Sequence, residues 1–476
     1  MIPLKAQTER PLYEQIYEYI KEEIRKGSLA AGTRLPSTRE LAEHLKVSRS
    51  TTQMAYDQLT AEGYIETVPY KGCYVMKIDE LVEVEPELPK EFWVEPEQEA
   101  SGAFVDFSPR GIDLTSFPYN AWRKVTRNTL VDDNKEMFLT GSPQGEPGLR
   151  EAIRAYLHSA RGVNCAAEQI IIGAGSEYLL MLLSRMLGQG RRIAMENPTY
   201  RQAYRVFESL GYDMAPVEMD RYGMDVGRLE ESEADVAYIM PSHQYPMGIV
   251  MPVKRRQELL TWAAKSGNRY IIEDDYDSEF RYRGKPIPAM QGMDSAGKVI
   301  YIGTFSKSIA PAIRVGYLVL PGALLHIYKE QYSFYASTVS RIDQKIIYQF
   351  LVEGHYERHL NRMRAIYKSK HDCLLGELKK MEAFFQIEGE FAGLHVLLND
   401  KKDRGEKWLV DMARMAGVCV YGLSAYYIGD SPSINRSTIV LGYARLTEEQ
   451  IRQGIARLYA AWCGKTECTE SMRGCQ

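Results

Sequence analysis

The chain has 476 residues, a formal net charge of -4 and a hydrophobic fraction of 45%. This length exceeds what one ordinary core organises, so we expect two unequal pieces, and the charge balance provides no basic tail. The seven cysteines are scattered and odd in number, which argues against a disulfide framework and a zinc site, and no metal is expected. No apolar run reaches membrane-spanning length and the first residues form no signal-peptide core, so we expect a cytoplasmic protein.

Residues 1–76 carry the pattern of three short helices and a hairpin. Apolar residues recur every four positions over residues 12–24, which predicts an amphipathic helix. The run Ser37-Thr38-Arg39-Glu40 is typical of a capping box that opens a second helix, and a third helix follows after a short turn. Two β-prone runs, at 65–68 and 73–76, complete the pattern of a winged helix-turn-helix.

The predicted DNA contacts cluster on the turn, at the start of the third helix and on the wing. They are Arg34, Ser37, Thr38, Arg39, Ser48, Arg49, Ser50, Thr51, Thr52 and Lys71. Short polar side chains and an arginine at the start of a recognition helix suit phosphates and base edges in the major groove. A protein-interaction module is the alternative, because the total charge of this segment is balanced, but the local cations favour double-stranded DNA. One small module contacts few phosphates, so we expect a dimer that binds two half-sites.

The rest of the chain divides by composition and by hydrophobic period. Residues 77–103 are rich in glutamate and proline and poor in core residues, which predicts an extended acidic linker. Over 104–353, strand-like runs alternate with helical ones, which predicts a mostly parallel α/β sheet with ligands at the carboxyl ends of its strands. From Gly354 a long helix, short strands and a last helix predict a small α+β subdomain over 354–463, followed by a tail at 464–476.

The segment 303–317 carries the clearest chemistry. Lys307 stands between Ser306 and Ser308 at the end of an apolar run, and Arg314 follows seven residues later. An amine that condenses with an aldehyde, beside hydroxyls and a guanidinium that hold a phosphate, is what a pyridoxal 5'-phosphate (PLP) site needs. A single lysine is most often a solvated surface amine, but the whole spaced set favours the cofactor.

These motifs together resemble MocR-type regulators of the GntR superfamily, over essentially the whole chain. The residues that carry the resemblance are Leu35-Pro36-Ser37-Thr38-Arg39-Glu40, Val47-Ser48-Arg49, Glu62-Gly63-Tyr64, Pro241-Ser242-His243-Gln244, Glu273-Asp274-Asp275-Tyr276-Asp277-Ser278-Glu279-Phe280 and the segment 303–317. The resemblance implies a GntR-like winged helix joined to a fold-type I aminotransferase domain. It also implies PLP as the cofactor and a homodimer.

Roles for residues around the cofactor ring follow from the resemblance. Lys307 matches the lysine that bonds the cofactor, Asp274 the carboxylate at the pyridine nitrogen, and Tyr276 the group directed at the phenolic oxygen. On spacing alone, Asp275 and Asp277 compete with Asp274. Tyr200 stands where the family has an aromatic residue stacked on the ring, although an ordinary core tyrosine is the alternative reading.

The phosphate is expected at the start of a helix. Gly175-Ser176-Glu177 opens a helix after a strand, so that backbone N–H groups and the helix dipole can hold an anion. Ser176 and Glu177 are therefore predicted cofactor-binding residues. Thr304, Ser306 and Arg314 would complete this pocket.

Several positions depart from the enzyme pattern. Tyr245 stands where the enzymes have the asparagine that meets the ring oxygen, with His243 or Gln244 as possible substitutes. Val440 stands where aminotransferases often have the arginine for the substrate carboxylate. The remaining candidates for an effector carboxylate are Arg201, Arg205, Arg436 and Arg445.

Two functions are compatible with these features. The first is a PLP-dependent, DNA-binding transcriptional regulator whose aminotransferase-like domain senses an amine, an amino acid or PLP. The second is a catalytically active aminotransferase with an appended DNA-binding domain. A fused DNA-binding module makes sense when occupancy of the PLP site changes DNA affinity, and the departure at Val440 argues against efficient transamination. Both features favour the regulator, which can still retain weak transaminase activity.

Overall fold

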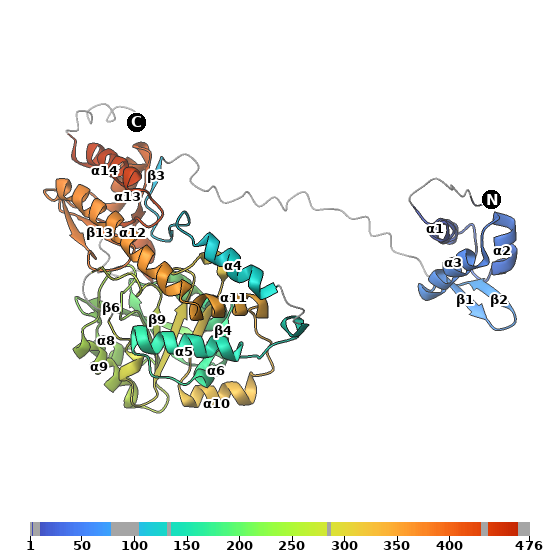
Figure 1. Cartoon of the computed structure of the whole chain (residues 1–476), viewed down its shortest axis with the longest axis horizontal. Coiled ribbons are helices and arrows are strands. Elements are labelled where there is room, and N and C mark those ends of the chain that lie inside the picture. Colours follow the sequence, from blue (N-terminus) through green and yellow to red (C-terminus); the bar gives the residue numbers. More distant parts are fainter. Residues whose placement is uncertain are drawn as a thin grey trace, which may run out of the picture. The chain divides into compact units, whose positions relative to one another are not determined.

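The computed structural model describes residue 2 and residues 10–77, 104–130, 135–282, 287–429 and 437–464 (Figure 1). The chain divides into two compact units, residues 1–97 and 98–476, and each is described by itself. Residues 78–103 of the predicted linker, Arg436 and residues 465–476 of the predicted tail lie outside the described residues. None of the helices in the described part combines the length and the apolar character that a membrane crossing requires.

The first unit is the predicted winged helix. Its elements are α1 (Leu12–Arg25), α2 (Thr38–Leu45), α3 (Arg49–Ala61), β1 (Ile65–Val68) and β2 (Gly72–Val75). The capping box is confirmed, because the Ser37 hydroxyl accepts from the Glu40 amide and the Glu40 carboxylate accepts from the Ser37 amide. The apolar stripe of α1 packs with Ala55 and Leu59 of α3 in one buried cluster, so this unit has a core of its own.

The second unit is built on an eight-stranded sheet. Its strands are β4 (Ile170–Gly173), β5 (Arg192–Asn197), β6 (Asp213–Asp220), β7 (Gly223–Met224), β8 (Val236–Ile239), β9 (Tyr270–Asp275), β10 (Val299–Thr304) and β11 (Gly316–Val319). Their order is β4-β11-β10-β9-β8-β5-β6-β7. The five strands from β10 to β6 are parallel, whereas β11 and β7 run antiparallel to their neighbours, which confirms a mostly parallel sheet.

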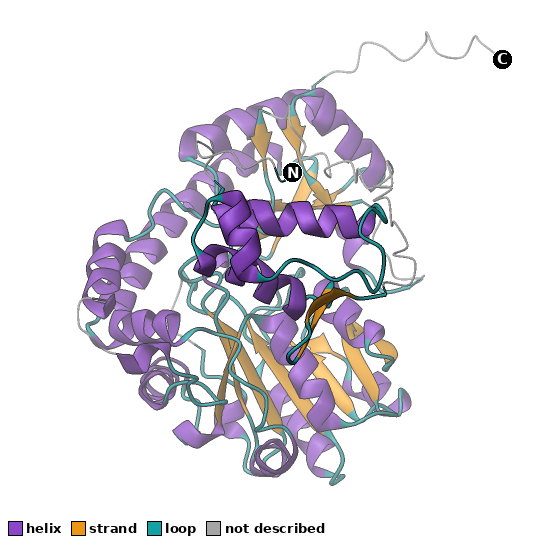
Figure 2. Ribbon diagram, turned by 90° about the vertical axis from the view of Figure 1, so that its right-hand side faces the viewer, coloured by secondary structure: helices purple, strands orange, loops and turns teal. Residues whose placement is uncertain are grey.

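Helices flank both faces of this sheet (Figure 2). They are α4 (Tyr119–Leu130), α5 (Pro147–Arg161), α6 (Ser176–Leu187), α7 (Arg201–Ser209), α8 (Val226–Glu231), α9 (Val253–Ala264), α10 (Gly322–Gln331) and α11 (Arg341–Val352). One buried cluster joins α6, α7 and α10 to the sheet, a second joins α8 and α9, and a third joins α5 and α11. The sheet is therefore covered by apolar side chains on both faces, as a parallel sheet requires.

The remaining elements form the small α+β subdomain. They are α12 (His355–Leu378), β12 (Phe385–Glu388), β13 (His395–Asp400), α13 (Glu406–Met415), β14 (Val418–Cys419), β15 (Tyr421–Gly422), β16 (Thr438–Gly442) and α14 (Glu448–Cys463). Four of the strands make a sheet in the order β12-β13-β16-β15. The strand that follows the linker, β3 (Val105–Asp106), pairs in parallel with β14, so it is attached to this subdomain rather than to the large sheet.

Candidate functional site

Lys307 follows β10 and its amine points at the backbone of a distant segment. Its Nζ donates to the carbonyl oxygen of Arg110 at 2.9 Å and lies 3.4 Å from that of Pro109. Burial lowers the pKa of Lys307 to about 8; the charge of Arg110 lowers it further and that of Asp277 opposes the change. An amine with such a pKa is partly neutral near pH 8 and is therefore a competent nucleophile.

The three neighbouring aspartates have different partners. Asp275 forms a buried ion pair with Arg161 at 2.8 Å and also accepts from the Tyr301 hydroxyl. Asp277 pairs with His243 at 2.9 Å. Asp274 accepts only from the Tyr238 hydroxyl in the hydrogen bonds found among the described residues. Of the three, Asp274 is thus the carboxylate that pairs with neither an arginine nor a histidine among the described residues.

Asp274 is also the one whose charge is costly in the absence of a cation. Burial raises its pKa to about 7, the Tyr238 hydroxyl opposes the rise, and the charges of Asp275 and Asp277 add to it. A protonated ring nitrogen placed beside it would stabilise its ionised form. A buried carboxylate whose ionised form requires a nearby cation is suited to face a pyridinium nitrogen.

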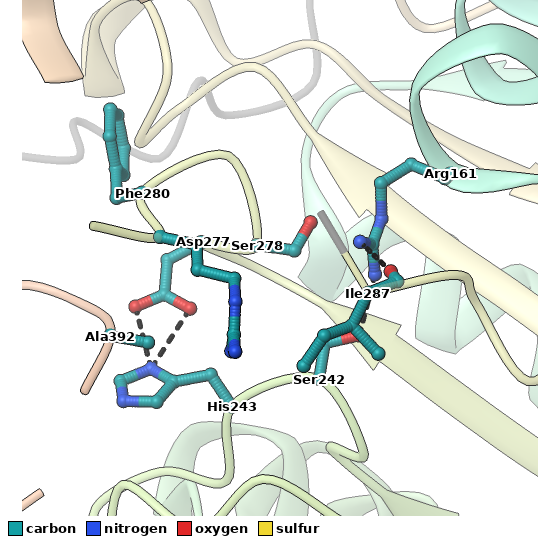
Figure 3. A pocket seen from close by; sticks show the side chains of 9 residues that line it. Arg161, Ser242, His243, Asp277, Ser278, Phe280, Ile287 and Ala392 are labelled. Carbon is teal, nitrogen blue, oxygen red and sulfur yellow. Dashed lines mark hydrogen bonds and ion pairs between the residues drawn. The ribbon is translucent and has the colours of Figure 1, made fainter. Parts of the chain in front are cut away.

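Tyr276 and His243 lie together beside Asp277. The Tyr276 hydroxyl lies 2.8 Å from His243 Nδ1, and the two rings are stacked with centroids 5.9 Å apart. His243 faces the Asp277 carboxylate through the same nitrogen (Figure 3). His243 and Asp277 border a cavity of about 10 Å³ that Arg161 and Ser242 also line. Among the alternatives to the missing asparagine, His243 is therefore the one in contact with Tyr276.

The residues predicted to bind the phosphate lie near the ends of three neighbouring strands. Thr304 of β10 pairs with Gly316 of β11, which pairs with Gly173 of β4. The turn after β4 reaches the start of α6, where Gly175 has φ +89° and a Cβ there would lie 2.5 Å from Arg314 Nη2. A glycine is therefore required for the guanidinium to lie against the first turn of α6.

Hydroxyls and charges complete this end of the site. The Thr304 hydroxyl donates to Ser306 Oγ at 2.9 Å, and Arg314 forms an ion pair with Glu177 at 2.6 Å. The Glu177 carboxylate thus holds the arginine, and only its backbone N–H remains suited to an anion. Ser176 is the first residue of α6, where free N–H groups and the helix dipole favour a phosphate.

Tyr200 is subject to the charges at both ends of the site. It caps α7 and packs edge-on against Tyr245, with ring centroids 6.2 Å apart. Burial raises its pKa to about 12; Asp274 and Glu177 add to the rise, whereas Arg110 and Arg314 oppose it. One tyrosine is thus within electrostatic reach of the aspartate end and of the arginine end.

The predicted effector arginines are scattered. Val440 is fully buried in β16 opposite Leu397. Arg445 pairs with Asp106 at 3.2 Å, Arg201 lies 3.4 Å from the carbonyl oxygen of Ala425, and Arg205 is exposed on α7. Sequence reasoning missed Arg110, which is 197 positions from Lys307 and has no spacing that marks it.

The predicted DNA contacts are mostly exposed. Arg34, Ser37, Arg39, Ser48, Arg49, Ser50 and Lys71 are exposed, and Thr38 and Thr51 are half-buried. The Ser48 hydroxyl lies 2.7 Å from that of Ser50 and 2.8 Å from that of Thr51, which fixes the start of α3. Thr52 differs, because it is fully buried and donates to the carbonyl oxygen of Thr38 at 2.8 Å. Its hydroxyl joins α3 to α2 and is not available to DNA.

Comparisons with known proteins cover both units. The family model of bacterial regulatory proteins of the gntR family matches residues 12–75, and that of class I and II aminotransferases matches residues 113–458. The probable rhizopine catabolism regulatory protein MocR of Rhizobium meliloti is 31% identical over 476 residues, which cover 97% of this chain and 96% of that protein. The chain is a MocR-type transcriptional regulator of the GntR family.

Other comparisons agree with this membership. The HTH-type transcriptional regulator YdeL of Bacillus subtilis is 38% identical to the regulator over 453 residues, covering 95% of the chain and 97% of YdeL. Kynurenine aminotransferase of Pyrococcus horikoshii, solved in complex with PMP, superposes with a TM-score of 0.68 at 24% identity, covering 78% of this chain and 93% of that one. The latter comparison shows that the large unit of the regulator has the aminotransferase fold, a fold that implies PLP as cofactor.

The residues of the regulator fit such a cofactor. PLP has an aldehyde, a ring nitrogen and a phosphate. The site offers a half-buried amine with a lowered pKa at Lys307 and a carboxylate without a cationic partner at Asp274. It also offers a helix start with an arginine and two hydroxyls near Gly175. Tyr200 lies within electrostatic reach of both ends. The chemistry of this donor set matches the three features of the cofactor.

Proposed function

We propose that this regulator binds PLP at Lys307 and converts the state of that site into a change in its affinity for DNA. The observation that carries the proposal is the position of the Lys307 amine, which donates to the carbonyl oxygen of Arg110 at 2.9 Å. Arg110 lies on the segment that continues from the linker and pairs with the small subdomain through β3. A change in the bonding of this amine therefore acts on the segment that leads to the winged helix.

Each residue around the site has a proposed role. Bound PLP supplies an electrophilic aldehyde carbon and an electron-withdrawing ring. Asp274 pairs with the ring nitrogen, Tyr276 donates to the phenolic oxygen, and Tyr200 covers a face of the ring. The first N–H groups of α6, with Thr304, Ser306 and Arg314, hold the phosphate, while Glu177 orients the Arg314 guanidinium.

The partner of the winged helix is double-stranded DNA. The exposed start of α3 is proposed to enter the major groove, with Arg49 as the residue that contacts a base edge. A homodimer would present two such helices to two half-sites, and operator affinity would fall steeply as salt rises. DNA binding and the free cysteines among the described residues suit a cytoplasmic protein.

The signal is an amine, an amino acid or PLP itself. An incoming amine would release the Lys307 amine, and loading of PLP would engage it. Either event changes the hydrogen bonds to Pro109 and Arg110, and with them the contact between the large sheet and the small subdomain. A coupling free energy of about 1–3 kcal/mol between this site and the operator is enough for a switch.

The test compares operator affinity between the apo and the PLP-loaded full-length protein. Fluorescence anisotropy with a two-half-site operator gives the dissociation constants, and borohydride fixation followed by peptide mapping identifies the labelled lysine. We expect the label on Lys307 and a change of at least about fivefold in operator affinity on loading of PLP or addition of an effector. Failure to load PLP, or operator affinity that is equal in all states, contradicts the proposal.

A further inference from the structure

The position where aminotransferases often have the arginine for the substrate carboxylate is occupied by a buried valine, Val440. Val440 lies in the middle of β16, with Leu397 of β13 on one side and Tyr421 of β15 on the other. It is fully buried and apolar, so this strand position offers no cation to a ligand at Lys307. Any anionic group of an effector must be bound by a cation from another segment.

The backbone of Arg110 is in direct contact with the Lys307 amine. Its own carbonyl oxygen accepts from Lys307 Nζ at 2.9 Å. The backbone before it is fixed, because the Gly442 amide donates to Phe107 at 2.8 Å and a Cβ at Gly442 would lie 2.4 Å from Pro109 Cα. The backbone after it is held too, because the Asp113 amide donates to the buried Tyr367 hydroxyl at 3.0 Å. The point from which the Arg110 side chain projects is thus set by packing on both sides.

The side chain of Arg110 remains exposed and has no carboxylate within ion-pairing distance among the described residues. Three other arginines near the site are in ion pairs: Arg445 with Asp106 at 3.2 Å, Arg314 with Glu177 at 2.6 Å and Arg161 with Asp275 at 2.8 Å. Arg201 donates to the carbonyl oxygen of Ala425 at 3.4 Å. Arg110 differs from these arginines, because its backbone contacts the Lys307 amine and its guanidinium has no partner among the described residues, so it is available to a ligand.

The charge of Arg110 is directed at the residues around the amine. Burial raises the pKa of Tyr200, Tyr245 and Tyr426, and Arg110 opposes the rise in all three. These rings form one group, because the Tyr245 hydroxyl donates to that of Tyr426 at 3.1 Å and Tyr200 packs on Tyr245. The Arg110 charge thus acts on the Lys307 amine and on this group of phenols, which places all of them within electrostatic reach of one another.

We propose that Arg110 determines effector specificity by pairing with the carboxylate of an effector that carries both an amine and a carboxylate, that is, an amino acid. This inference rests on the proposed function, since it requires that an effector amine engages the PLP site at Lys307. A guanidinium binds a carboxylate through two parallel hydrogen bonds, which a simple amine cannot provide. Simple amines should therefore bind less tightly than their carboxylated counterparts.

The test uses full-length, PLP-loaded protein and matched pairs of ligands. The panel contains the common amino acids together with two matched pairs, glycine with methylamine and 4-aminobutyrate with propylamine. Dissociation constants are taken from the change in visible absorption, and operator affinity is measured with each ligand. We compare the wild type with Arg110→Met, Arg110→Lys and Arg414→Met, the last removing an exposed cation of α13 as the matched control.

At least one amino acid should bind tighter than its decarboxylated partner, and Arg110→Met should weaken that amino acid by about tenfold or more without weakening the amine. Arg110→Lys should lie between, and Arg414→Met should match the wild type. Equal affinities in Arg110→Met and the wild type, or no response to any amino acid, overturn the inference. The proposed function fails separately, when the wild type does not load PLP or its operator affinity never changes.

Discussion

The winged helix and the aminotransferase-like domain position their functional side chains in opposite ways. All predicted DNA contacts lie between Arg34 and Lys71, on elements that local caps define, such as the box at Ser37 and the cap at Ser48. The groups around Lys307 come from segments far apart, with Arg110 separated from it by 197 positions. The first region depends on short-range helix signals and the second on the sheet that gathers distant strand ends.

This contrast implies that the winged helix can lose DNA binding without loss of PLP binding in the aminotransferase-like domain, and the reverse. The winged helix has a separate buried core, and the PLP domain is covered by three apolar clusters of its own. Substitutions that remove one function should therefore leave the other measurable. The predictions below test that independence, from the largest expected effect to the smallest.

Removal of the Lys307 amine should have the largest effect. Lys307→Ala has no group that can bond the aldehyde of PLP. We therefore expect complete loss of the visible absorption band of the bound cofactor, and no label on the protein after borohydride treatment. Operator binding by the winged helix should persist, although it should no longer respond to PLP or amines. Lys329→Ala, at an exposed position on α10, is the control and should retain the band. A band in Lys307→Ala would assign the chemistry to another lysine.

Loss of a core side chain in α3 should abolish operator binding and leave PLP binding intact. Leu59 is fully buried, and Leu59→Ala should destabilise the winged helix by about 2–5 kcal/mol. We expect operator binding to fall sharply while the visible band and the melting of the PLP domain stay unchanged. Gln58→Ala, at the exposed neighbouring position, should bind the operator normally. Loss of the band in Leu59→Ala would show that the two units do not fold independently.

The lowered pKa of Lys307 predicts how PLP loading depends on pH. Only the neutral amine attacks the aldehyde, and with a pKa of about 8 its neutral fraction rises about 50-fold between pH 6 and pH 8. The rate at which apo protein takes up PLP should rise by a similar factor over this range and level off above pH 8. A rate that keeps rising tenfold per unit up to pH 10 would indicate an ordinary, solvated lysine.

A single DNA contact should have a smaller effect. Arg49 is exposed at the first position of α3, and Arg49→Ala should weaken specific operator binding by about 1–3 kcal/mol if this side chain contacts a guanine. Arg25→Ala, at the end of α1, removes a cation outside the predicted surface and should change binding little. The comparison is made at a fixed salt concentration. Equal losses in both variants would point to a general charge effect rather than base contact.

Much of the fold follows from local sequence signals. The helix over residues 12–25, the box at Ser37 and the helix Ser176–Leu187 are where periodicity and capping residues predict them. The strand β6 (Asp213–Asp220) was not predicted, because it contains Pro216, carries acidic residues and is only partly buried. Its pairing with β5 is a tertiary contact that no local pattern encodes.

The site was predictable in its motifs but not in its partners. Spacing could not separate Asp274 from Asp275 and Asp277, because the difference lies in the side chains that contact them, Arg161 for Asp275 and His243 for Asp277. The burial of Thr52 likewise depends on how α3 packs against α2, since its neighbours at the helix start are all polar. The cofactor roles of Lys307 and Asp274 remain predictions that the labelling experiment tests.

The strand β3 decides where an autonomous sensing fragment must begin. Val105 and Phe107 are fully buried among residues of α14, β14 and β16, and the Phe104 and Phe107 amides donate to the carbonyl oxygens of Gly417 and Cys419. A fragment that starts at Ile112 would lose part of that core together with the carbonyl oxygens that hold Lys307. A fragment that starts at Gln98 keeps both. The strand β3, which follows the linker, is thus a structural part of the small α+β subdomain.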